Sequence, residues 1–155
     1  SVYENNIALI KPDKDFQFTS AVKSIRLNGE YVAIARNSLT IGWGVVNASN
    51  IYISPLRYFE ASIISVNECI IRISNTVKYA IPPINDSHIC TVPKANNSAC
   101  RGDAGGPLVY NNEIIGILSF TAIQCYHSQN DEFPNCYTRI SSFLPFIRRY
   151  IKKIL

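Results

Sequence analysis

The side chains with the greatest capacity for chemistry are five cysteines and two histidines. No Cys-x-x-Cys pair occurs, and His88 and His127 stand alone, so the spacing does not favour a zinc site. Disulfide bonds formed in an oxidising compartment are the better interpretation of the cysteines. Three Asn-x-Ser sequons, each a weak signal alone, agree with this; they begin at Asn47, Asn85 and Asn96. We therefore expect a secreted, extracellular protein with no metal ion and no other cofactor.

Length, charge and hydropathy narrow the class of partner. A chain of 155 residues suits one domain, or one domain and a piece of another. The net charge of +4 is small and the basic residues are scattered, which is not typical of a nucleic-acid-binding surface. No apolar run has membrane-spanning length, and the first residues lack a signal-peptide pattern. We expect no nucleic acid and no membrane as partners, and we expect Ser1 to be an internal position of a longer protein.

Short apolar runs alternate with turn-rich stretches, and Tyr, Phe, Ile and Val are frequent, which favours strands. The expected strands are Asn6–Lys11, Tyr31–Arg36, Leu39–Trp43, Arg57–Val66, Pro107–Tyr110, Ile114–Thr121 and Cys136–Ile140. Between two of them, Asn111-Asn112 is a candidate tight turn. Many short strands at this spacing predict an antiparallel sandwich or barrel.

Clear helical periodicity occurs only near the C-terminus. The apolar stripe there consists of Phe143, Phe146, Ile147, Tyr150, Ile151 and Ile154. Ser141 or Ser142 is the expected N-cap. The other face carries Arg148, Arg149, Lys152 and Lys153. We interpret these basic residues as the solvent-exposed face of a helix that packs on the barrel; the alternative is a site for an anionic partner.

The segment CRGDAGGPLV at 100–109 resembles the Gly-Asp-Ser-Gly-Gly-Pro motif of chymotrypsin/trypsin-like serine proteases, with Ala104 in place of the serine. Further family landmarks occur in the right order. NNIALI at 5–10 resembles the segment with the catalytic aspartate, and IGWG at 41–44 resembles Ser-Gly-Trp-Gly. IIGILSF at 114–120 resembles the substrate-binding strand, and YTRI at 137–140 resembles the strand before the family's last helix. The resemblance covers essentially the whole chain.

This resemblance implies an all-β fold. We expect the complete second Greek-key barrel of a chymotrypsin-like protein, preceded by the last strand of the first barrel and followed by a C-terminal α-helix. Residues 1–27 would form the end of the first barrel and the linker, residues 28–140 the second barrel, and residues 141–155 the helix. The implied partners are the missing N-terminal half or chain that carries the first barrel, and a protein or peptide ligand.

Two positions of the catalytic triad are altered. In the family, serine attacks the substrate, histidine transfers the proton, and a buried aspartate orients the histidine. Ala104 has no lone pair with which to attack. Asn6 stands at the aspartate position, and that replacement alone lowers turnover about 10⁴-fold in trypsin. The family histidine lies upstream of the Asn6 segment and is not in this chain, since neither His88 nor His127 matches its motif.

One replacement is enough to silence a protease deliberately, so two replacements indicate natural loss of catalysis. We therefore predict a non-catalytic homologue that acts by binding, as a decoy, a cofactor or a regulator in a proteolytic system. The alternative is a chymotrypsin-like endopeptidase represented by a fragment or chain with inactivating substitutions. A third possibility is a segment with no separate function within a longer chain.

The loop around Ala104 keeps other family features. Gly102 supplies a backbone N–H that the resemblance assigns to the oxyanion hole. Asp103 resembles the residue that pairs with the cleaved amino terminus of active family members. Arg101-Gly102-Asp103 also spells an integrin-binding tripeptide, which we interpret as coincidence because the family buries this aspartate.

The resemblance also assigns a specificity pocket. Ser98 matches its base, where trypsins carry aspartate, so a preference for basic residues is not supported. Thr121 and Asn135 replace glycines that keep the pocket open, which predicts a shortened or closed pocket. They are equally compatible with unselected residues in an unused pocket. The strand residues Ser119 and Phe120 line the same region.

The cysteine pairing follows from the resemblance as well. Cys69 with Cys90, and Cys100 with Cys125, match two disulfides of the family. In the chain-entropy model, closing the loop between Cys69 and Cys90 stabilises the folded state by roughly 3 kcal/mol. Cys136 is left over at a position where the family carries an apolar strand residue. We expect it to be a free buried thiol; the alternative is a partner in the missing half.

Overall fold

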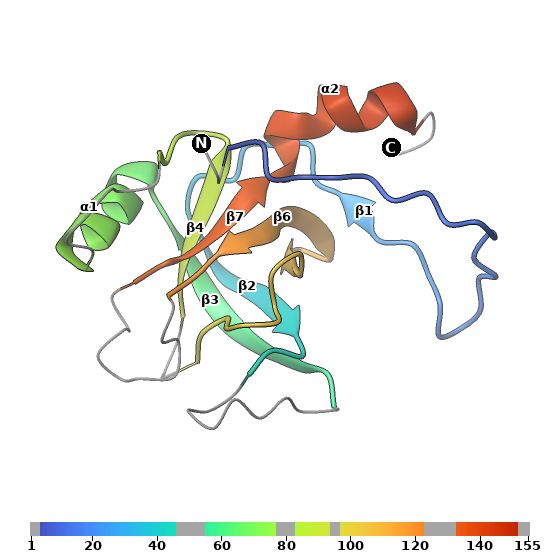
Figure 1. The fold of residues 1–155 in the computed structure, drawn as a ribbon, viewed down its shortest axis with the longest axis horizontal. Helices are drawn as coiled ribbons and strands as arrows, with labels where there is room; N and C mark the ends of the chain where they lie inside the picture. The colour runs from blue at the N-terminus through green and yellow to red at the C-terminus, as the bar shows by residue number, and fades with distance from the viewer. Residues whose placement is uncertain (1–3, 46–54, 77–82, 94–96, 123–132, 152–155) are drawn as a thin grey trace.

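A computed structural model describes residues 4–45, 55–76, 83–93, 97–122 and 133–151 of the chain (Figure 1). Within these residues, six antiparallel strands close into a barrel. Around the barrel they run β6 (Glu113–Phe120), β5 (Pro107–Tyr110), β2 (Ala35–Gly42), β3 (Arg57–Ile64), β4 (His88–Pro93) and β7 (Asn135–Arg139). β7 pairs with β6 and completes the ring. The expected all-β, chymotrypsin-like barrel is confirmed.

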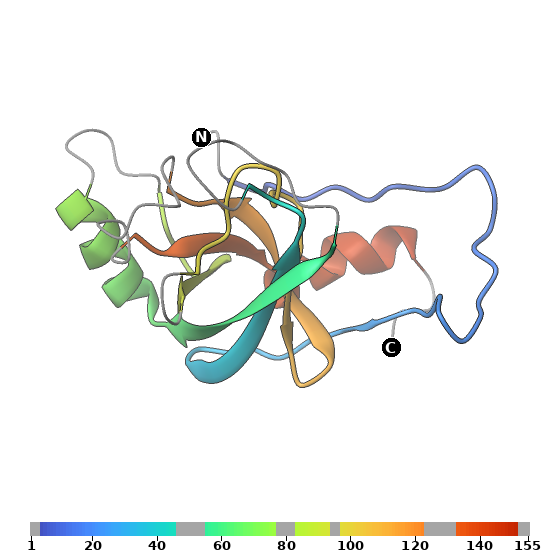
Figure 2. The same ribbon diagram turned by 90° about the horizontal axis from the view of Figure 1, so that it is seen from below.

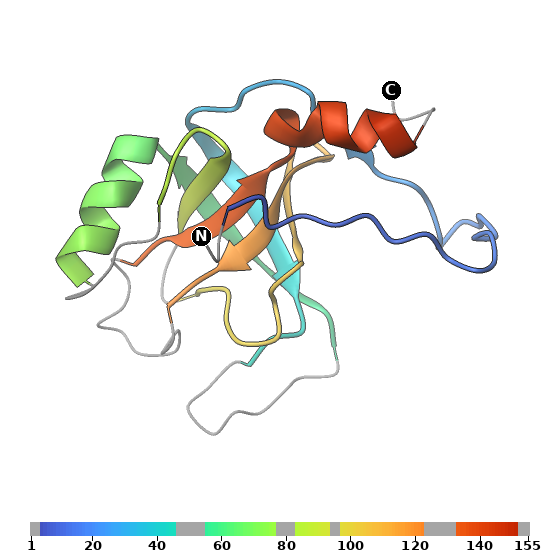
Figure 3. The same cartoon turned by 45° about the horizontal axis from the view of Figure 1, so that its top comes forward.

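Three further elements lie outside this ring. β1 (Arg26–Leu27) pairs in parallel with β6. The helices α1 (Val66–Thr76) and α2 (Ile140–Tyr150) flank the barrel on opposite sides (Figure 3). The predicted C-terminal helix is confirmed as α2, which follows β7 without a loop.

The barrel interior is filled mainly by apolar side chains. Tyr137, Leu108 and Ile63 are almost completely buried in this core. Gly116 on β6 leaves room for β7, because a Cβ there would lie 2.9 Å from the Tyr137 Cβ. The close approach of β6 and β7 therefore depends on a glycine at this position.

Four of the expected strands are confirmed to within two residues, and they correspond to β3, β5, β6 and β7. The Asn111-Asn112 turn is confirmed too, since both residues have positive φ, 50° and 61°, as a type I′ hairpin turn requires. In place of the predicted strands Tyr31–Arg36 and Leu39–Trp43, the structure has one strand, β2, which begins only at Ala35; the first prediction was therefore wrong for residues 31–34. A bulge carries the strand through Asn37, which adopts φ 62°, so the polar pair at 37–38 does not end it.

The predicted strand Asn6–Lys11 was wrong. These residues belong to an extended arm, residues 4–25, that runs away from the barrel and returns to β1 (Figure 2). The strand pairings of the described residues include none for this segment, so its backbone has no ladder partner. Apart from the half-buried Ile7, the side chains of the arm are exposed.

Three elements were missed, and one cap was misassigned. β1, β4 and α1 were not expected. The N-cap of α2 is Arg139, with no side-chain capping bond, so the prediction of Ser141 or Ser142 was wrong. The helix continues directly from β7, which leaves no loop residue to cap it. On the predicted stripe, Ile147 is buried, but Phe146, Tyr150 and Ile151 are exposed, and Ile154 lies outside the described residues.

Candidate functional site

The loop at 100–106 is a tight, glycine-dependent turn between Cys100 and β5. Gly102 and Gly105 have φ values of 99° and 86°, which side chains with a Cβ rarely adopt. The Asp103 N–H donates to the Cys100 carbonyl at 3.0 Å. The Gly105 N–H donates to the Leu118 carbonyl of β6 at 2.9 Å, which fastens the loop to the barrel.

Asp103 is held by backbone amides of this chain. Its Oδ1 accepts the Gly44 N–H at 2.7 Å, and its Oδ2 accepts the Cys100 N–H at 2.9 Å. A Cβ at Gly42 or Gly44 would overlap the Asp103 carboxylate. The Gly-Trp-Gly segment at 42–44 therefore provides the space that the carboxylate occupies. The resemblance compares Asp103 with the residue that pairs with the cleaved amino terminus of active family members, and the hydrogen bonds to Gly44 and Cys100 were not predicted.

Ala104 lies exposed on this loop, at the edge of a surface cavity of about 460 Å³. The cavity is lined by Ile41, Gly42, Trp43, Leu56 and residues 102–107. Asp103 is the one ionisable side chain in this lining, and both its oxygens already accept hydrogen bonds. The lining offers backbone N–H groups and apolar surface, but no side chain suited to nucleophilic attack or proton transfer.

Asn6 lies at the end of β6 that also contacts the Ala104 loop. Its Nδ2 donates to Ser119 Oγ at 2.9 Å, and its carbonyl accepts the Thr138 hydroxyl at 2.8 Å. Ser119 directly follows Leu118, to which the Ala104 loop is fastened. The structure thus places Asn6 and the loop of Ala104, the two positions that the resemblance assigns to the triad, beside neighbouring residues of one strand.

Three of the five predicted pocket residues, Ser98, Thr121 and Asn135, form one hydrogen-bonded cluster, whereas Ser119 accepts from Asn6 and Phe120 packs against an apolar cluster. Asn135 is completely buried, and its Oδ1 accepts the Ser98 hydroxyl at 3.0 Å and the Thr121 hydroxyl at 2.6 Å. The Thr121 hydroxyl also lies 3.1 Å from the Ala99 carbonyl. The Asn135 Nδ2 is buried without a hydrogen-bond partner. The three side chains therefore hold one another in place by hydrogen bonds around the buried Asn135.

The disulfide between Cys69 and Cys90 is confirmed; it joins α1 to β4. Cys100 is disulfide-bonded, and its predicted partner Cys125 lies outside the described residues. Cys136 is free and buried, and this burial raises the pKa of its thiol. Together with Cys69 and Cys90 it makes the one group of three metal-capable side chains found among the described residues. Two of those three sulfurs are bonded to each other.

The remaining sequence features are less informative. Asn85 is exposed, whereas Asn47 and Asn96 lie outside the described residues. Arg101 and Gly102 are exposed but the Asp103 carboxylate is engaged, so the tripeptide does not present a free acid. In the described part of the chain, no helix is both long and apolar enough to cross a membrane.

The fold and the glycine-rich loop define a chymotrypsin-like barrel, and comparison with known proteins agrees. The Trypsin family model matches residues 1–147, so the chain belongs to the trypsin family of serine-protease domains. Chymotrypsin-2 of Vespa crabro is 32% identical over 146 residues, which cover 94% of this chain and 61% of that protein. Kallikrein-11 of Mus musculus is 30% identical over 153 residues, which cover 97% of this chain and 51% of that protein.

Among solved structures, neuropsin, a serine protease expressed in mouse brain, has the same fold. The TM-score is 0.71 at 24% identity, with 88% of this chain and 57% of neuropsin covered. The chain thus spans between 51% and 61% of the length of these relatives.

Proposed function

We propose that the protein is a secreted, catalytically inactive homologue of the trypsin-like proteases that acts by binding another protein or a peptide. The observation that carries the proposal is the methyl group of Ala104 at the nucleophile position. The loop around it keeps the positive-φ glycines and the anchored Asp103. The nucleophile is therefore missing from a loop whose backbone conformation is still fixed by glycines and hydrogen bonds. This favours a loop that is retained for its binding surface over a loop that has degraded.

Asn6 supports the same conclusion by a separate route. Because its Nδ2 donates to Ser119, its Oδ1 is the atom left to orient a histidine supplied by the rest of the protein. A neutral amide oxygen can hold the imidazole, but it cannot stabilise the imidazolium formed during proton transfer. The loss at this position is then mainly a loss of charge, and a serine at position 104 would still lack a competent base.

The pocket cluster limits how a ligand would bind. Ser98 and Thr121 are tied to the buried Asn135, so a substrate side chain has little room to enter as it would in an open pocket. A binding function would instead use the surface around the Ala104 cavity, where the exposed Trp43 and Leu56 offer apolar contact. Such a surface suits an extended peptide or a protein loop.

The extended arm supports a second partner, which we propose to be the first barrel of the whole protein or of an associated chain. Ile10, Phe16 and Phe18 are 91%, 69% and 68% exposed. Large apolar side chains gathered on one arm mark an interaction surface. The relatives are longer than the matched region by about the size of such a barrel. The disulfide Cys69–Cys90 supports secretion, because such bonds persist in oxidising compartments.

The test is hydrolysis by the whole protein, after cleavage of any activation site. Peptide substrates with small and with large apolar side chains should be turned over no faster than in buffer. The same substrates should be cut by an active trypsin-like protease assayed in parallel. Turnover that an irreversible serine-directed inhibitor abolishes would instead establish an endopeptidase with a nucleophile elsewhere.

A further inference from the structure

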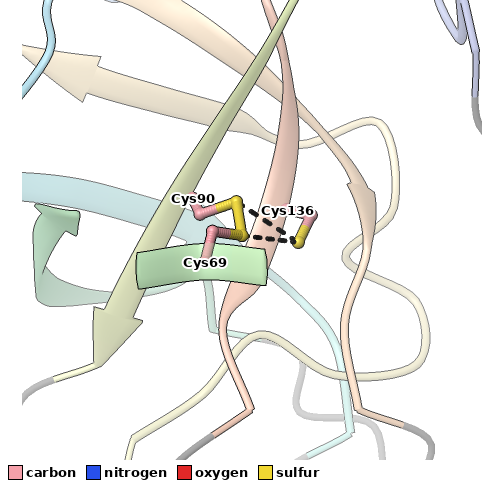
Figure 4. A group of neighbouring side chains, drawn as sticks. All are labelled: Cys69, Cys90 and Cys136. Atoms are coloured by element: carbon pink, nitrogen blue, oxygen red, sulfur yellow. Dashed lines mark hydrogen bonds between the residues drawn. A yellow bond between two sulfur atoms is a disulfide. The ribbon is translucent and has the colours of Figure 1, made fainter. Parts of the chain in front are cut away.

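A free thiol lies against a disulfide in a buried apolar cluster that also contains Ile64, Ile73 and Ile84 (Figure 4). The Cys136 Sγ is 3.6 Å from the Cys90 Sγ and 3.9 Å from the Cys69 Sγ. All three side chains are at most 2% exposed. Figure 4 shows the Cys136 sulfur pointing at the bonded pair from β7, with α1 on the other side.

The strand register makes a second disulfide geometrically possible. Cys90 on β4 and Cys136 on β7 are direct cross-strand partners in an antiparallel pair. Such partners have Cα atoms about 4.5–5.5 Å apart. This separation falls within the range of about 4.4–6.8 Å that disulfides occupy. Cys90 can therefore bond to Cys69 or to Cys136 without a change in the sheet.

We propose that these three residues form a thiol–disulfide exchange site with two alternative bonds, Cys69–Cys90 and Cys90–Cys136. The Cys136 thiolate attacks the Cys90 sulfur and forms the new S–S bond. The Cys69–Cys90 bond breaks, and its electron pair leaves on the Cys69 sulfur, which takes up the proton that Cys136 released. One disulfide and one thiol exist before and after, so the step needs no oxidant or reductant.

The exchange changes how α1 is attached. In the described state, Cys69 ties the helix covalently to β4, while the buried Ile73 supports it by packing. In the alternative state the covalent bond lies entirely within the sheet, and α1 is held by apolar contact alone. The start of α1 also lines a cavity of about 370 Å³ with Tyr31 and Asp86. The exchange is thus a switch on the mobility of α1 and of this cavity wall.

The same geometry makes the exchange slow in the closed protein. The two sulfur distances are similar, so the Cys136 sulfur lies beside the S–S bond. In-line attack instead requires the attacking sulfur to lie beyond one end of that bond. A side chain must rotate before reaction. The apolar surroundings also keep the thiol protonated, and only a thiolate attacks. Opening of α1 is therefore the step that we expect to control the rate.

The experiment maps the free thiol in the whole protein over time. Samples held without reductant at a temperature just below melting are quenched in acid, labelled with a maleimide in denaturant, and digested. We expect labelling to start at Cys136 and to appear progressively at Cys69, together with a peptide linked through Cys90–Cys136. Hydrogen exchange of the α1 amides should accelerate in the same samples. Labelling confined to Cys136 at every time would overturn the proposal.

Two variants sharpen the result. In Cys136→Val the attacking sulfur is replaced by an apolar side chain, so Cys69 should never be labelled. If Cys69 is labelled in that variant, the exchange does not depend on Cys136 and the proposal is wrong. In Cys69→Ala, air oxidation should remove both Cys90 and Cys136 from maleimide labelling, whereas two persisting thiols would contradict the second bond. If this variant does not fold, the time course of the unmodified protein decides alone.

Discussion

Replacing Asp103 should destabilise the fold strongly, although the side chain belongs to a half-exposed loop. Its carboxylate accepts two charge-assisted hydrogen bonds, from Gly44 and Cys100, at 2.7 and 2.9 Å. Such bonds are worth about 1.5–3 kcal/mol each. Partial exposure of the group reduces the total, so we expect Asp103→Ala to cost about 3 kcal/mol. Asp103→Asn should cost about half as much, because one oxygen acceptor remains.

Urea unfolding followed by the fluorescence of Trp43 measures this directly. Trp43 is the single tryptophan and lies between the two glycines that contact Asp103. With a slope of about 2 kcal/mol per molar urea, a loss of about 3 kcal/mol lowers the midpoint by about 1.5 M. The exposed Asp15 provides the matched control, and Asp15→Asn should leave the midpoint unchanged within error.

A double-mutant cycle tests the geometry itself. Gly44→Ala should be destabilising because its Cβ would overlap the carboxylate of Asp103. In the Asp103→Ala background that overlap is gone, so the same change should cost at least about 1 kcal/mol less. If Asp103→Ala unfolds within about 0.5 kcal/mol of the unmodified protein, the anchoring role of the carboxylate is refuted. Strict additivity of the two changes would contradict the predicted contact.

Three further predictions concern the barrel. Tyr137→Phe should cost about 1–2 kcal/mol at neutral pH, because the buried Thr40 hydroxyl loses its partner at 2.6 Å. Burial raises the pKa of Tyr137, so the hydroxyl's contribution to the free energy of unfolding is present below pH ~10 and is lost at higher pH. Thermal melts above pH ~10 should therefore show a smaller loss of stability in Tyr137→Phe than in the unmodified protein. Arg139→Met should cost about 3–5 kcal/mol in urea unfolding, because three backbone carbonyls lose the charge-assisted hydrogen bonds that the guanidinium donates. The exposed Arg149→Met is the control, and its effect should be near zero. Gly116→Ala should lower the melting temperature through contact with Tyr137, at a cost of about 1–3 kcal/mol, and an unchanged melt would mean that β6 and β7 can separate freely.

Local patterns were sufficient for most of the barrel. Apolar alternation and turn chemistry located β3, β5, β6 and β7, since those signals are contained within a few residues. α1 could have been found as well. Ser65 and Glu68 have capping-box spacing, and the Ser65 Oγ accepts the Glu68 N–H at 3.1 Å. The apolar stripe that follows is short, and its β-branched isoleucines are equally typical of a strand.

β4 and the arm depend on distant parts of the molecule. β4 contains His88 and Thr91, which are polar yet buried, so no apolar alternation identifies it. Residues 6–11 have a strand-like composition, but a strand requires a neighbour, and composition does not provide one. Propensity in such segments is overridden by tertiary contacts.

The residues of the candidate site could be predicted from the sequence, but their hydrogen-bond partners could not. Two family-like motifs identified Asp103 with Ala104 and Asn6, but Gly44, which donates to Asp103, lies 59 residues away, and Ser119, which accepts from Asn6, lies 113 residues away. The same holds for Cys136, whose position beside the disulfide follows from the register of β4 and β7. Each of these relations arises from barrel closure, which no local pattern encodes.

The most direct test of the central claim is to restore the triad residues in the whole protein. Ala104→Ser, Asn6→Asp and the double variant should be assayed on the same peptide substrates. If catalysis was lost at both positions, serine alone should give little turnover, and the double variant should exceed it by orders of magnitude because triad members act as a unit. We expect even the double variant to remain slow, because the hydrogen-bonded Ser98, Thr121 and Asn135 would obstruct the proposed specificity pocket. Brisk hydrolysis from Ala104→Ser alone would contradict the account and identify an endopeptidase silenced by a single change.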